Sequence, residues 1–422
     1  MIQRQLAKIR DSELRSVGRK MGRLPFWAWR LTLTIAAVPV VVVCRLIQPW
    51  LCIRFGFLTV DRIGHFAFDL EYYLSERTII LRKEKSLDLF FYKRRPANSQ
   101  LDLMARRTIF VHPVVAYLFA ANRLLPGGQI HQIVPARHRT ASRDKRGIFS
   151  HVSPQLRFTE AEEKSGLDYL LKVGCKDGAK VVCLVIRDQS YLKQIQGERD
   201  WSYHDFRDTK IEDYRDCALA LAEKGYWVFR MGKVVSSGFG VEHSRIIDYA
   251  RSPDRSDFLD VWLMSKCFFA ISTGLGLDSI ADIFRRPQVF VNYLPLMDLE
   301  AWGDYITVPK ILSWAGSGRR LTLQEHLSHA SVNGHYFRKS GIKITDLSPL
   351  HITDAVLERE ARLVGTWSSS EEDVFLQKTF WQVLRNDHQF ETYHGWISPN
   401  ARIGAKFIRE MGRGFFSVES DL

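Results

Sequence analysis

Basic and glycine residues follow two apolar segments in the second half of the chain, and their chemistry suits a phosphate. These residues are Arg187, Arg230, Gly232 and Lys233, and the acidic Asp188, a further candidate, follows Arg187. An arginine can donate two parallel hydrogen bonds to a phosphate, and a glycine lets the backbone approach a ligand closely. Paired cations also stabilise a departing diphosphate. We therefore predict a nucleotide diphosphate site here, with a surface salt bridge or a solvated basic loop as the alternative.

A glycine-rich junction follows the apolar segment 267–272. Its candidate ligand-binding residues are Ser272, Thr273, Gly274, Gly276 and Asp278. Glycines before a helix, together with unpaired N–H groups at its start, bind anions. The junction has neither the P-loop ending GK[ST] nor the spacing GxGxxG, so phosphorylation by ATP and dinucleotide binding lose support. Arg255 is a further candidate, although it precedes Ser256, which is typical of a structural helix N-cap.

A histidine in the first half has the chemistry of a general base. His65 lies at a predicted strand-to-helix turn, and an imidazole titrates near neutral pH, so it can accept a proton from an acceptor hydroxyl. Asp61 and Asp69 are further candidates for this role. A hydrogen-bonded structural histidine is the alternative. The residues that we expect to hold the acceptor are Arg62, Gly64 and Asn98.

The elements that position these residues follow an α/β pattern. The expected strands of the second half are 181–186, 226–229, 245–250, 267–272 and 287–293. In an open parallel sheet the ligand lies beyond the carboxyl ends of the strands, where the basic and glycine residues fall. The first half also reads as α/β, with a strand at 51–56, a helix at 66–77 and a strand at 88–92. We place a polar linker at 135–165 and amphipathic helices near 371–386 and 400–411.

Composition indicates a globular protein with an anionic partner. Of its residues 46% are apolar and 25% are charged, and the net charge is +13. Nucleic acid is the weakest candidate, because no binding motif occurs and aromatics do not alternate with basic residues. Neither CxxC nor HExxH occurs, so we expect no metal site. The cysteines have no paired spacing and read as small buried hydrophobic residues.

The N-terminus combines a basic arm with an apolar segment. The uncharged run 31–44 is shorter than the roughly 20 residues that a spanning helix needs, and extending it past Arg45 includes Pro39 and Pro49. We predict a shallow or re-entrant anchor on anionic headgroups at the cytoplasmic face of the inner membrane, peripheral or monotopic. A buried helix of the first domain is the alternative.

Five segments resemble a known family. They are 62–65 (RIGH), 183–192 (CLVIRDQSYL), 227–233 (WVFRMGK), 255–276 (RSDFLDVWLMSKCFFAISTGLG) and 287–296 (PQVFVNYLPL). The chain resembles a poorly characterised bacterial family of GT-B glycosyltransferases of cell-surface polysaccharide synthesis. One departure is Leu275, which stands where a small hydroxyl residue is expected.

The resemblance implies two Rossmann-like domains, with an acceptor domain at 55–150 and a nucleotide-sugar donor domain at 166–345. The arm and apolar segment occupy 1–54, and a helical tail at 346–422 packs back across the domains. Arg187, Arg230, Lys233 and 273–276 would hold the donor phosphates, and His65 would be the base. The implied partners are a nucleotide sugar, a glycan or lipid-linked acceptor and an anionic membrane surface, with no metal and no further cofactor. The alternatives are a nucleotide-sugar 2-epimerase and a non-catalytic envelope-assembly scaffold.

Overall fold

The computed structural model describes residues 24–80, 85–176, 178–187, 206–331 and 333–417. Contacts divide the chain into two compact units that interleave along the sequence. Unit 1 comprises Met1–Leu58, Ile80–Arg95 and Arg106–Pro135, and unit 2 comprises Thr59–Ile79, Pro96–Ala105 and Ala136–Leu422. The domain limits that we predicted are continuous along the chain, and they stay a prediction.

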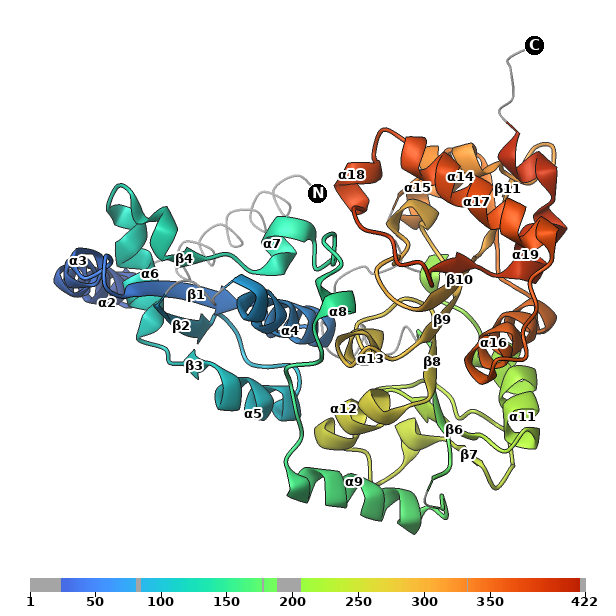
Figure 1. Ribbon diagram of the computed structural model, residues 1–422, viewed down its shortest axis with the longest axis horizontal. Helices are drawn as coiled ribbons and strands as arrows, with labels where there is room; N and C mark the ends of the chain where they lie inside the picture. The colour runs from blue at the N-terminus through green and yellow to red at the C-terminus, as the bar shows by residue number, and fades with distance from the viewer. Residues whose placement is uncertain (1–23, 81–84, 177, 188–205, 332, 418–422) are drawn as a thin grey trace, which may run out of the picture. The chain divides into compact units, whose positions relative to one another are not determined.

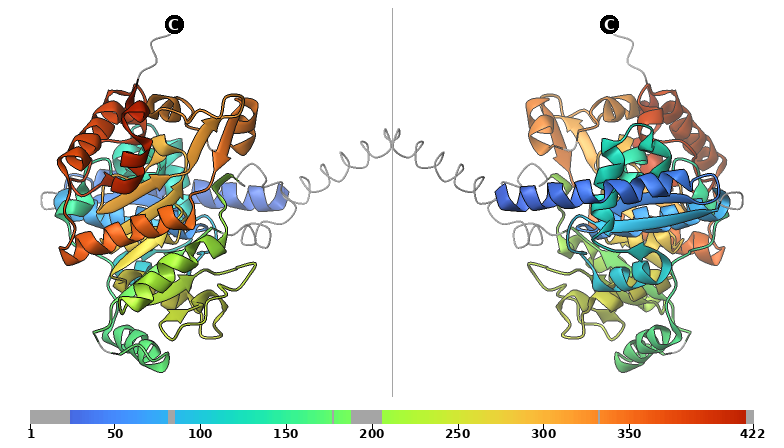
Figure 2. Two further views of the ribbon diagram at one scale, coloured as in Figure 1. Left: turned by 90° about the vertical axis from the view of Figure 1, so that its right-hand side faces the viewer. Right: turned by 90° about the vertical axis from the view of Figure 1, so that its left-hand side faces the viewer.

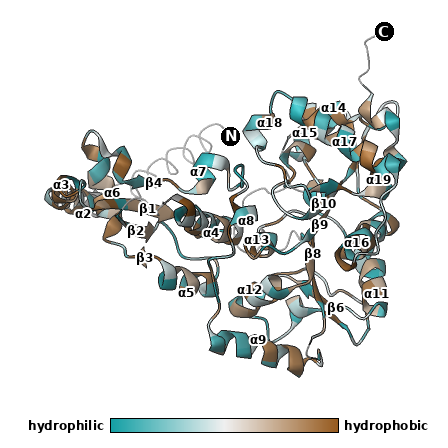
Figure 3. Cartoon of the chain, in the orientation of Figure 1, coloured by the Kyte–Doolittle hydropathy of each residue, from teal (hydrophilic) through white to brown (hydrophobic). Residues whose placement is uncertain are grey.

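Unit 2 is built on a parallel sheet of seven strands in the order β13-β10-β9-β8-β5-β6-β7. The strands are β5 (Val181–Val185), β6 (Trp227–Met231), β7 (Ile246–Ile247), β8 (Phe269–Ser272), β9 (Gln288–Tyr293), β10 (Tyr305–Pro309) and β13 (Arg402–Ile403). Every residue of β5, β6, β8, β9 and β10 is buried, as expected for a sheet covered on both faces. In Figure 3 strand β8 carries mostly the colour of hydrophobic residues. The chain order of the strands reverses between β5 and β8, where ligands bind in doubly wound sheets.

Helices pack against both faces of this sheet (Figure 1). On one side lie α11 (Arg215–Glu223) and α16 (Pro349–Val364), and on the other lie α12 (Asp257–Lys266) and α13 (Asp278–Ile283). Helix α12 begins where the sequence predicts, because the Ser256 hydroxyl accepts the Leu259 N–H at 3.1 Å. Helix α9 (Glu160–Lys172) begins with a capping box between Thr159 and Glu162, and it also packs on α12.

Further elements belong wholly or mostly to unit 2. They are α4 (Ile63–Ile80), α5 (Ser99–Thr108), α7 (Ala136–Thr140), α8 (Ile148–His151), η3 (Ile211–Tyr214), η4 (Tyr249–Arg251), η5 (Leu296–Asp298), β11 (Ile311–Trp314), α14 (Leu323–Ser328), α15 (Gly334–Lys339), β12 (Ile342–Thr345), α17 (Glu371–Asn386), α18 (Phe390–Tyr393), α19 (Ala405–Met411) and η6 (Arg413–Phe416). Strands β11 and β12 form a separate antiparallel pair. The predicted helical tail also supplies β13, so it contributes to the sheet as well as to its covering.

Unit 1 holds a second parallel sheet in the order β3-β2-β1-β4. Its elements are α2 (Leu24–Ala36), α3 (Val38–Leu46), β1 (Cys52–Leu58), β2 (Ser86–Tyr92), β3 (Phe110–Val111), α6 (Val115–Leu124), η1 (Gly128–His131) and β4 (Gln132–Ile133). Figure 2 shows α2 and α3 running end to end along this sheet. One side of α3 enters the core of the unit, where Val41 and Cys44 pack with Phe55 and Val115.

The stretch 136–153 was predicted to belong to a polar linker, and this prediction is wrong. It contains α7 and α8, and it is packed into unit 2 through buried polar side chains. Asp144 is fully buried and accepts the N–H groups of Ile148 at 2.9 Å and Phe149 at 2.7 Å. The charged residues of this stretch therefore serve as internal hydrogen-bond partners, which a polar composition alone does not reveal.

Two predicted boundaries differ in a way that affects the site. Strand β6 continues through Arg230 to Met231, so Arg230 lies inside the strand and not in the loop after it. Helix α4 begins at Ile63, which places Gly64 and His65 in its first turn. All six cysteines are free and buried, in agreement with the prediction that they are not a disulfide set.

The N-terminal helices expose a broad apolar surface. Among the described residues, Ala28–Leu46 is long and apolar enough to cross a membrane, judged by length and composition. Its exposed side chains include Leu31, Ile35, Val43 and Leu46. Arg45, which interrupts the apolar run, turns into unit 1 and donates to the Asn122 side chain at 2.8 Å. The predicted basic arm covers residues 1–30, and its first 23 residues lie outside the described part of the chain.

Candidate active site

Two of the predicted ligand residues meet where the strand order of the unit 2 sheet reverses. The backbone N–H of Arg187, just after β5, donates to the Thr273 hydroxyl oxygen, just after β8, at 3.1 Å. The Arg187 side chain is 15% exposed and donates through Nε to Asp208 at 3.1 Å. A guanidinium is thus held at the carboxyl edge of the sheet, at the switch point where ligands bind in such folds.

Two backbone N–H groups of the junction after β8 donate hydrogen bonds to side chains of the junction itself. The hydroxyl oxygen of Ser272 accepts the Gly274 N–H at 3.1 Å, and Asp278 accepts the Leu275 N–H at 2.6 Å. Burial raises the pKa of the Asp278 carboxyl to about 6, although bonds from Ser272 and Leu275 oppose this shift. We predicted free N–H groups at this junction, and for Gly274 and Leu275 that prediction is wrong. Asp278 therefore stabilises the conformation of this loop through hydrogen bonds within the junction.

Backbone geometry at Gly274 brings a further arginine to the loop. Gly274 has a φ of +74°, and a Cβ there would lie 2.8 Å from the Tyr293 ring, so only glycine fits. Its carbonyl oxygen accepts a hydrogen bond from Nη2 of Arg207 at 2.5 Å. Sequence reasoning missed Arg207, because it lies in a charged stretch and does not directly follow an apolar strand.

The first turn of α4 lies against this loop. A Cβ built on Gly64 would lie 2.8 Å from the Gly276 Cα, and one built on Gly276 would lie 3.1 Å from the Gly64 nitrogen. Backbone atoms cannot move aside as a flexible side chain can, so a Cβ at Gly64 would force a shift and one at Gly276 would be tight. The predicted acceptor-side residue and the predicted donor-side residue are therefore direct neighbours within unit 2.

We expect Gly64→Ala to destabilise the protein by about 1–3 kcal/mol, because the added methyl group must push the Gly276 backbone away. Alanine otherwise favours a helix by about 0.5–1 kcal/mol, so the clash reverses the usual sign. Urea unfolding measures the difference. Gly316→Ala is the matched control, since nothing lies within 4 Å of a Cβ at that position. A Gly64→Ala protein as stable as the parent would contradict this close approach.

His65 belongs to a hydrogen-bonded chain of three side chains. Its Nδ1 lies 3.0 Å from the Ser142 hydroxyl oxygen, and that hydroxyl donates to Asp69 Oδ1 at 3.1 Å. A hydroxyl has only one proton, so Nδ1–H of His65 must be the donor to Ser142. The Nε2 atom then carries the lone pair, which is the form that a general base needs.

The surroundings of His65 keep its imidazole neutral. Burial lowers its pKa to about 4, and the positive charges of Arg137 and Arg62 lower it further, while Asp61 raises it. Arg62 and Asp61 are themselves exposed at the start of α4. At neutral pH the ring is therefore unprotonated and able to accept a proton.

The sequence did not predict that Ser142 and Asp69 are the hydrogen-bond partners that orient His65. Asp69 is 1% exposed, and burial raises its pKa to about 6, so it is mostly ionised at neutral pH. Ser142 and its neighbour Ala141 both have positive φ values, of 57° and 55°. Neither residue type signals that conformation, because glycine and asparagine are the usual choices. The turn that delivers the Ser142 hydroxyl is therefore fixed by tertiary packing.

Two predicted phosphate-binding arginines are paired with carboxylates. Arg230 is 3% exposed and donates to Asp248 at 3.0 Å and to the Ser237 carbonyl at 3.1 Å. Arg255 donates to Asp260 at 2.5 Å. Arg230 therefore does not converge with Arg187 and Thr273 as predicted, because its side chain is buried toward β7 and the loop before it.

The other predicted residues surround the start of α12. Lys233, which follows Gly232 after β6, lies 3.3 Å from the carboxylate of Asp257. The Asn98 side chain donates to the Asp257 carbonyl oxygen at 2.9 Å and accepts the Leu101 N–H at 2.9 Å. Asn98 is 2% exposed, so it serves as a buried cap of α5. Asp188 lies outside the described residues.

The described part of the chain contains no group of three or more His, Cys, Asp or Glu residues close enough to hold a metal ion. Arg187 and Arg207 contribute positive charge near the switch point, and each of them also contacts a neighbouring polar group. Lys310 adds to this charge, because its Nζ donates to the Asp208 carbonyl oxygen at 2.7 Å.

No protein-family model and no curated protein matches the chain. Two solved structures are similar in part. The crystal structure of the glycosyl transferase family 9 from Veillonella parvula DSM 2008 has a TM-score of 0.39 and 10% identity, covering 61% of this chain and 85% of that one. The structure of E. coli ADP-heptose LPS heptosyltransferase II has a TM-score of 0.39 and 12% identity, covering 74% of this chain and 99% of that one.

Proposed function

We propose that this protein is a glycosyltransferase that moves a sugar from a nucleotide diphosphate donor to a cell-envelope glycan or lipid-linked acceptor. The observation that supports this proposal is the meeting of Arg187 and Thr273 at the switch point, with α4 and His65 beside the same loop. A cation for the diphosphate and a neutral imidazole for the acceptor are thus carried by adjoining elements of unit 2.

The proposed reaction needs two functions from these residues. Arg187 and Arg207 stabilise the negative charge that develops on the departing nucleotide diphosphate, so a metal ion is not required. His65 Nε2 accepts the proton of the acceptor hydroxyl as its oxygen bonds to the anomeric carbon. The bond between the anomeric carbon and the donor phosphate oxygen breaks in the same step. The fold that we propose for this reaction consists of two Rossmann-like domains of GT-B type.

A panel of nucleotide sugars tests the proposal. We expect at least one donor to raise the melting temperature, since binding to the folded state alone stabilises it. With that donor, nucleotide diphosphate should be released when an envelope glycan or lipid-linked acceptor fraction is added. Epimerised donor formed without an acceptor would indicate a 2-epimerase instead. No melting response to any nucleotide sugar would indicate a non-catalytic scaffold.

We also propose that the protein is held at the cytoplasmic face of the inner membrane by α2 and α3, as a peripheral or monotopic protein. Two observations support this placement. The exposed apolar side chains of these helices have no other cover among the described residues, and Arg45 is satisfied within unit 1 instead of facing outward. An exposed apolar helix surface binds the headgroup–acyl boundary.

We expect the double change Ile35→Glu and Val43→Glu to reduce binding to phosphatidylglycerol-containing vesicles about tenfold or more, because buried apolar area drives such binding. Cosedimentation measures it. The matched control is Leu350→Glu with Val374→Glu, which adds the same charges at apolar side chains that are each 61% exposed on unit 2. Equal losses in both double variants would contradict the assignment of the surface to α2 and α3.

A further inference from the structure

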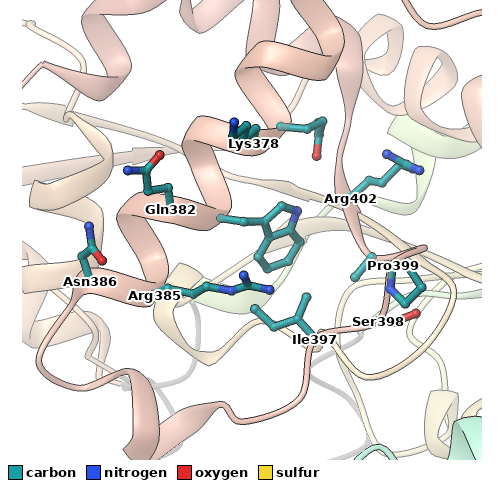
Figure 4. A pocket seen from close by; sticks show the side chains of 11 residues that line it. Lys378, Gln382, Arg385, Asn386, Ile397, Ser398, Pro399 and Arg402 are labelled. Atoms are coloured by element: carbon teal, nitrogen blue, oxygen red, sulfur yellow. The ribbon is translucent and has the colours of Figure 1, made fainter.

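A cavity of about 590 Å³ lies in unit 2 between α17 and the segment that leads into β13. Its lining includes Lys378, Trp381, Gln382, Arg385, Asn386 and Arg402. Figure 4 shows Lys378, Gln382, Arg385 and Asn386 projecting from α17, with Ile397, Pro399 and Arg402 on the facing segment. Arg402 begins β13, so this cavity lies toward the amino end of a parallel strand. Thr273 follows the carboxyl end of β8, so the cavity is separate from the candidate active site.

The two walls of the cavity are held together by hydrogen bonds. The Gln377 side chain donates to the Ile403 carbonyl oxygen at 2.6 Å and accepts the Ile403 N–H at 3.0 Å. The N–H of Ser398 donates to the Ala301 carbonyl oxygen at 2.8 Å, which fixes the facing segment. A ligand would therefore meet a hollow whose shape is already formed, and little ordering would be required on binding.

The basic side chains that line this cavity have no salt-bridge partner among the described residues. Within the described part of the chain, no carboxylate forms an ion pair with Lys378, Arg385 or Arg402, and no acidic residue lines the cavity. Burial lowers the pKa of the Arg402 guanidinium and the charge of Arg362 adds to this effect, while the carboxylates of Glu358 and Asp304 oppose it. Arg230 and Arg255, by contrast, each have a carboxylate partner. The cavity therefore favours an anion.

The other lining residues narrow the choice of anion. Trp381 offers an aromatic face, which attracts the weakly positive C–H groups of a sugar ring, just as it attracts cations. The amides of Gln382 and Asn386 can both donate to and accept from sugar hydroxyls. Single-stranded nucleic acid needs successive aromatic platforms, whereas a single tryptophan lines this cavity among the described residues.

We propose that this cavity binds an anionic saccharide, with Trp381 stacked on a sugar ring and Lys378, Arg385 and Arg402 around its acidic groups. The site does not depend on the proposed transfer reaction, since it uses none of the residues near Arg187 and His65. An anionic saccharide bound there would be held by a second, non-catalytic site on the same unit.

Titration calorimetry on the full chain without nucleotide sugar tests this proposal. The probes are tetragalacturonate, which supplies carboxylates, mannose 6-phosphate, which supplies a phosphate, and maltotetraose, which is neutral. We expect at least one anionic probe to bind about tenfold or more tightly than maltotetraose, because charge-assisted hydrogen bonds are the strong ones. The anionic probe that binds more tightly identifies the kind of acidic group. Its affinity should fall as salt is added.

Matched variants locate the binding. Lys378→Ala with Arg385→Ala should weaken the preferred anionic probe about tenfold or more, as each removes a charge-assisted contact. The control is Arg338→Ala with Lys339→Ala, which removes the same two charges from exposed positions on α15. Trp381→Ala should weaken the same probe while leaving the net charge unchanged.

Three results would overturn the proposal. They are no binding of either anionic probe below about 10 mM, equal affinity in the two double variants, or tighter binding of a short oligothymidylate than of both anionic saccharides. The nucleotide-sugar melting response should persist in the Lys378 and Arg385 double variant. Loss of the proposed transferase activity would therefore be distinguishable from loss of this second site.

Discussion

Replacing Arg187 by alanine is expected to lower kcat/KM for the nucleotide sugar by about a hundredfold to a thousandfold, as removing one preorganised charge donor does in other enzymes. Arg187 is held by Asp208 through Nε, and its backbone is held by Thr273, so its guanidinium is fixed before the donor arrives. Because charge on the departing diphosphate grows in the transition state, most of the loss should fall on kcat.

Steady-state kinetics with the donor found in the melting panel measures this effect. Arg215→Ala is the matched control, because Arg215 is another partly exposed arginine of unit 2 that lies near a carboxylate, 3.8 Å from Glu212. Arg187→Lys should recover only part of the activity, since an ammonium cannot form the two-pronged contact of a guanidinium. Unchanged donor kinetics in Arg187→Ala would rule out a role in diphosphate stabilisation.

Replacing His65 by glutamine is expected to lower kcat by about a hundredfold to ten-thousandfold, the usual range for loss of a general base. The donor KM should change little, because His65 acts on the acceptor hydroxyl. His388→Gln is a suitable control, since the His388 side chain is 80% exposed. A transferase that keeps its full kcat in His65→Gln would have its base elsewhere.

The pH dependence of kcat/KM provides a second readout of His65. Burial lowers its pKa to about 4, and only the neutral imidazole accepts a proton, so activity attributable to this group should persist from neutral pH down to about 5. It should then fall as the pH drops through about 4. An acid limb near 6.5, the ordinary histidine value, would contradict the effect of burial and of the neighbouring arginines.

Ser142→Ala separates the positioning of His65 from its chemistry. Removing the Ser142 hydroxyl leaves the imidazole in place but removes the acceptor that keeps its proton on Nδ1. We expect a smaller loss of kcat than in His65→Gln, with Ser142→Thr restoring part of it because the hydroxyl returns. A purely structural role of Ser142 would instead lower the melting temperature and leave the kcat of the folded protein unchanged.

Strands β5 to β9 of the unit 2 sheet were predictable because strands buried on both faces read as continuous apolar runs, whereas β10 and β13 were not predicted. The segments 181–186 and 287–293 correspond to β5 and β9 within about a residue at each end. Ser256 marked the start of α12, since an N-cap acts within one turn of its own helix. Local patterns also indicated that ligand residues would follow the strands, and Arg187 and Thr273 do meet there.

The partners of the charged residues could not be predicted, because they come from distant parts of the chain. Arg230 is paired with Asp248, so a cation that the sequence places at a strand end is buried and neutralised. Ser142 reaches His65 from 77 residues away through a turn of positive φ that neither residue type signals.

The sequence by itself determined five of the seven strands of the parallel sheet, where basic and glycine residues follow them, and which N-terminal residues form an apolar segment. These features depend on burial periodicity, helix capping and residue chemistry, which act over a few neighbouring positions. Only the tertiary structure decided which cations keep a carboxylate partner, and that Gly64 lies against Gly276. Such contacts join residues far apart in the chain, so their geometry is set by how the elements pack and not by any local pattern.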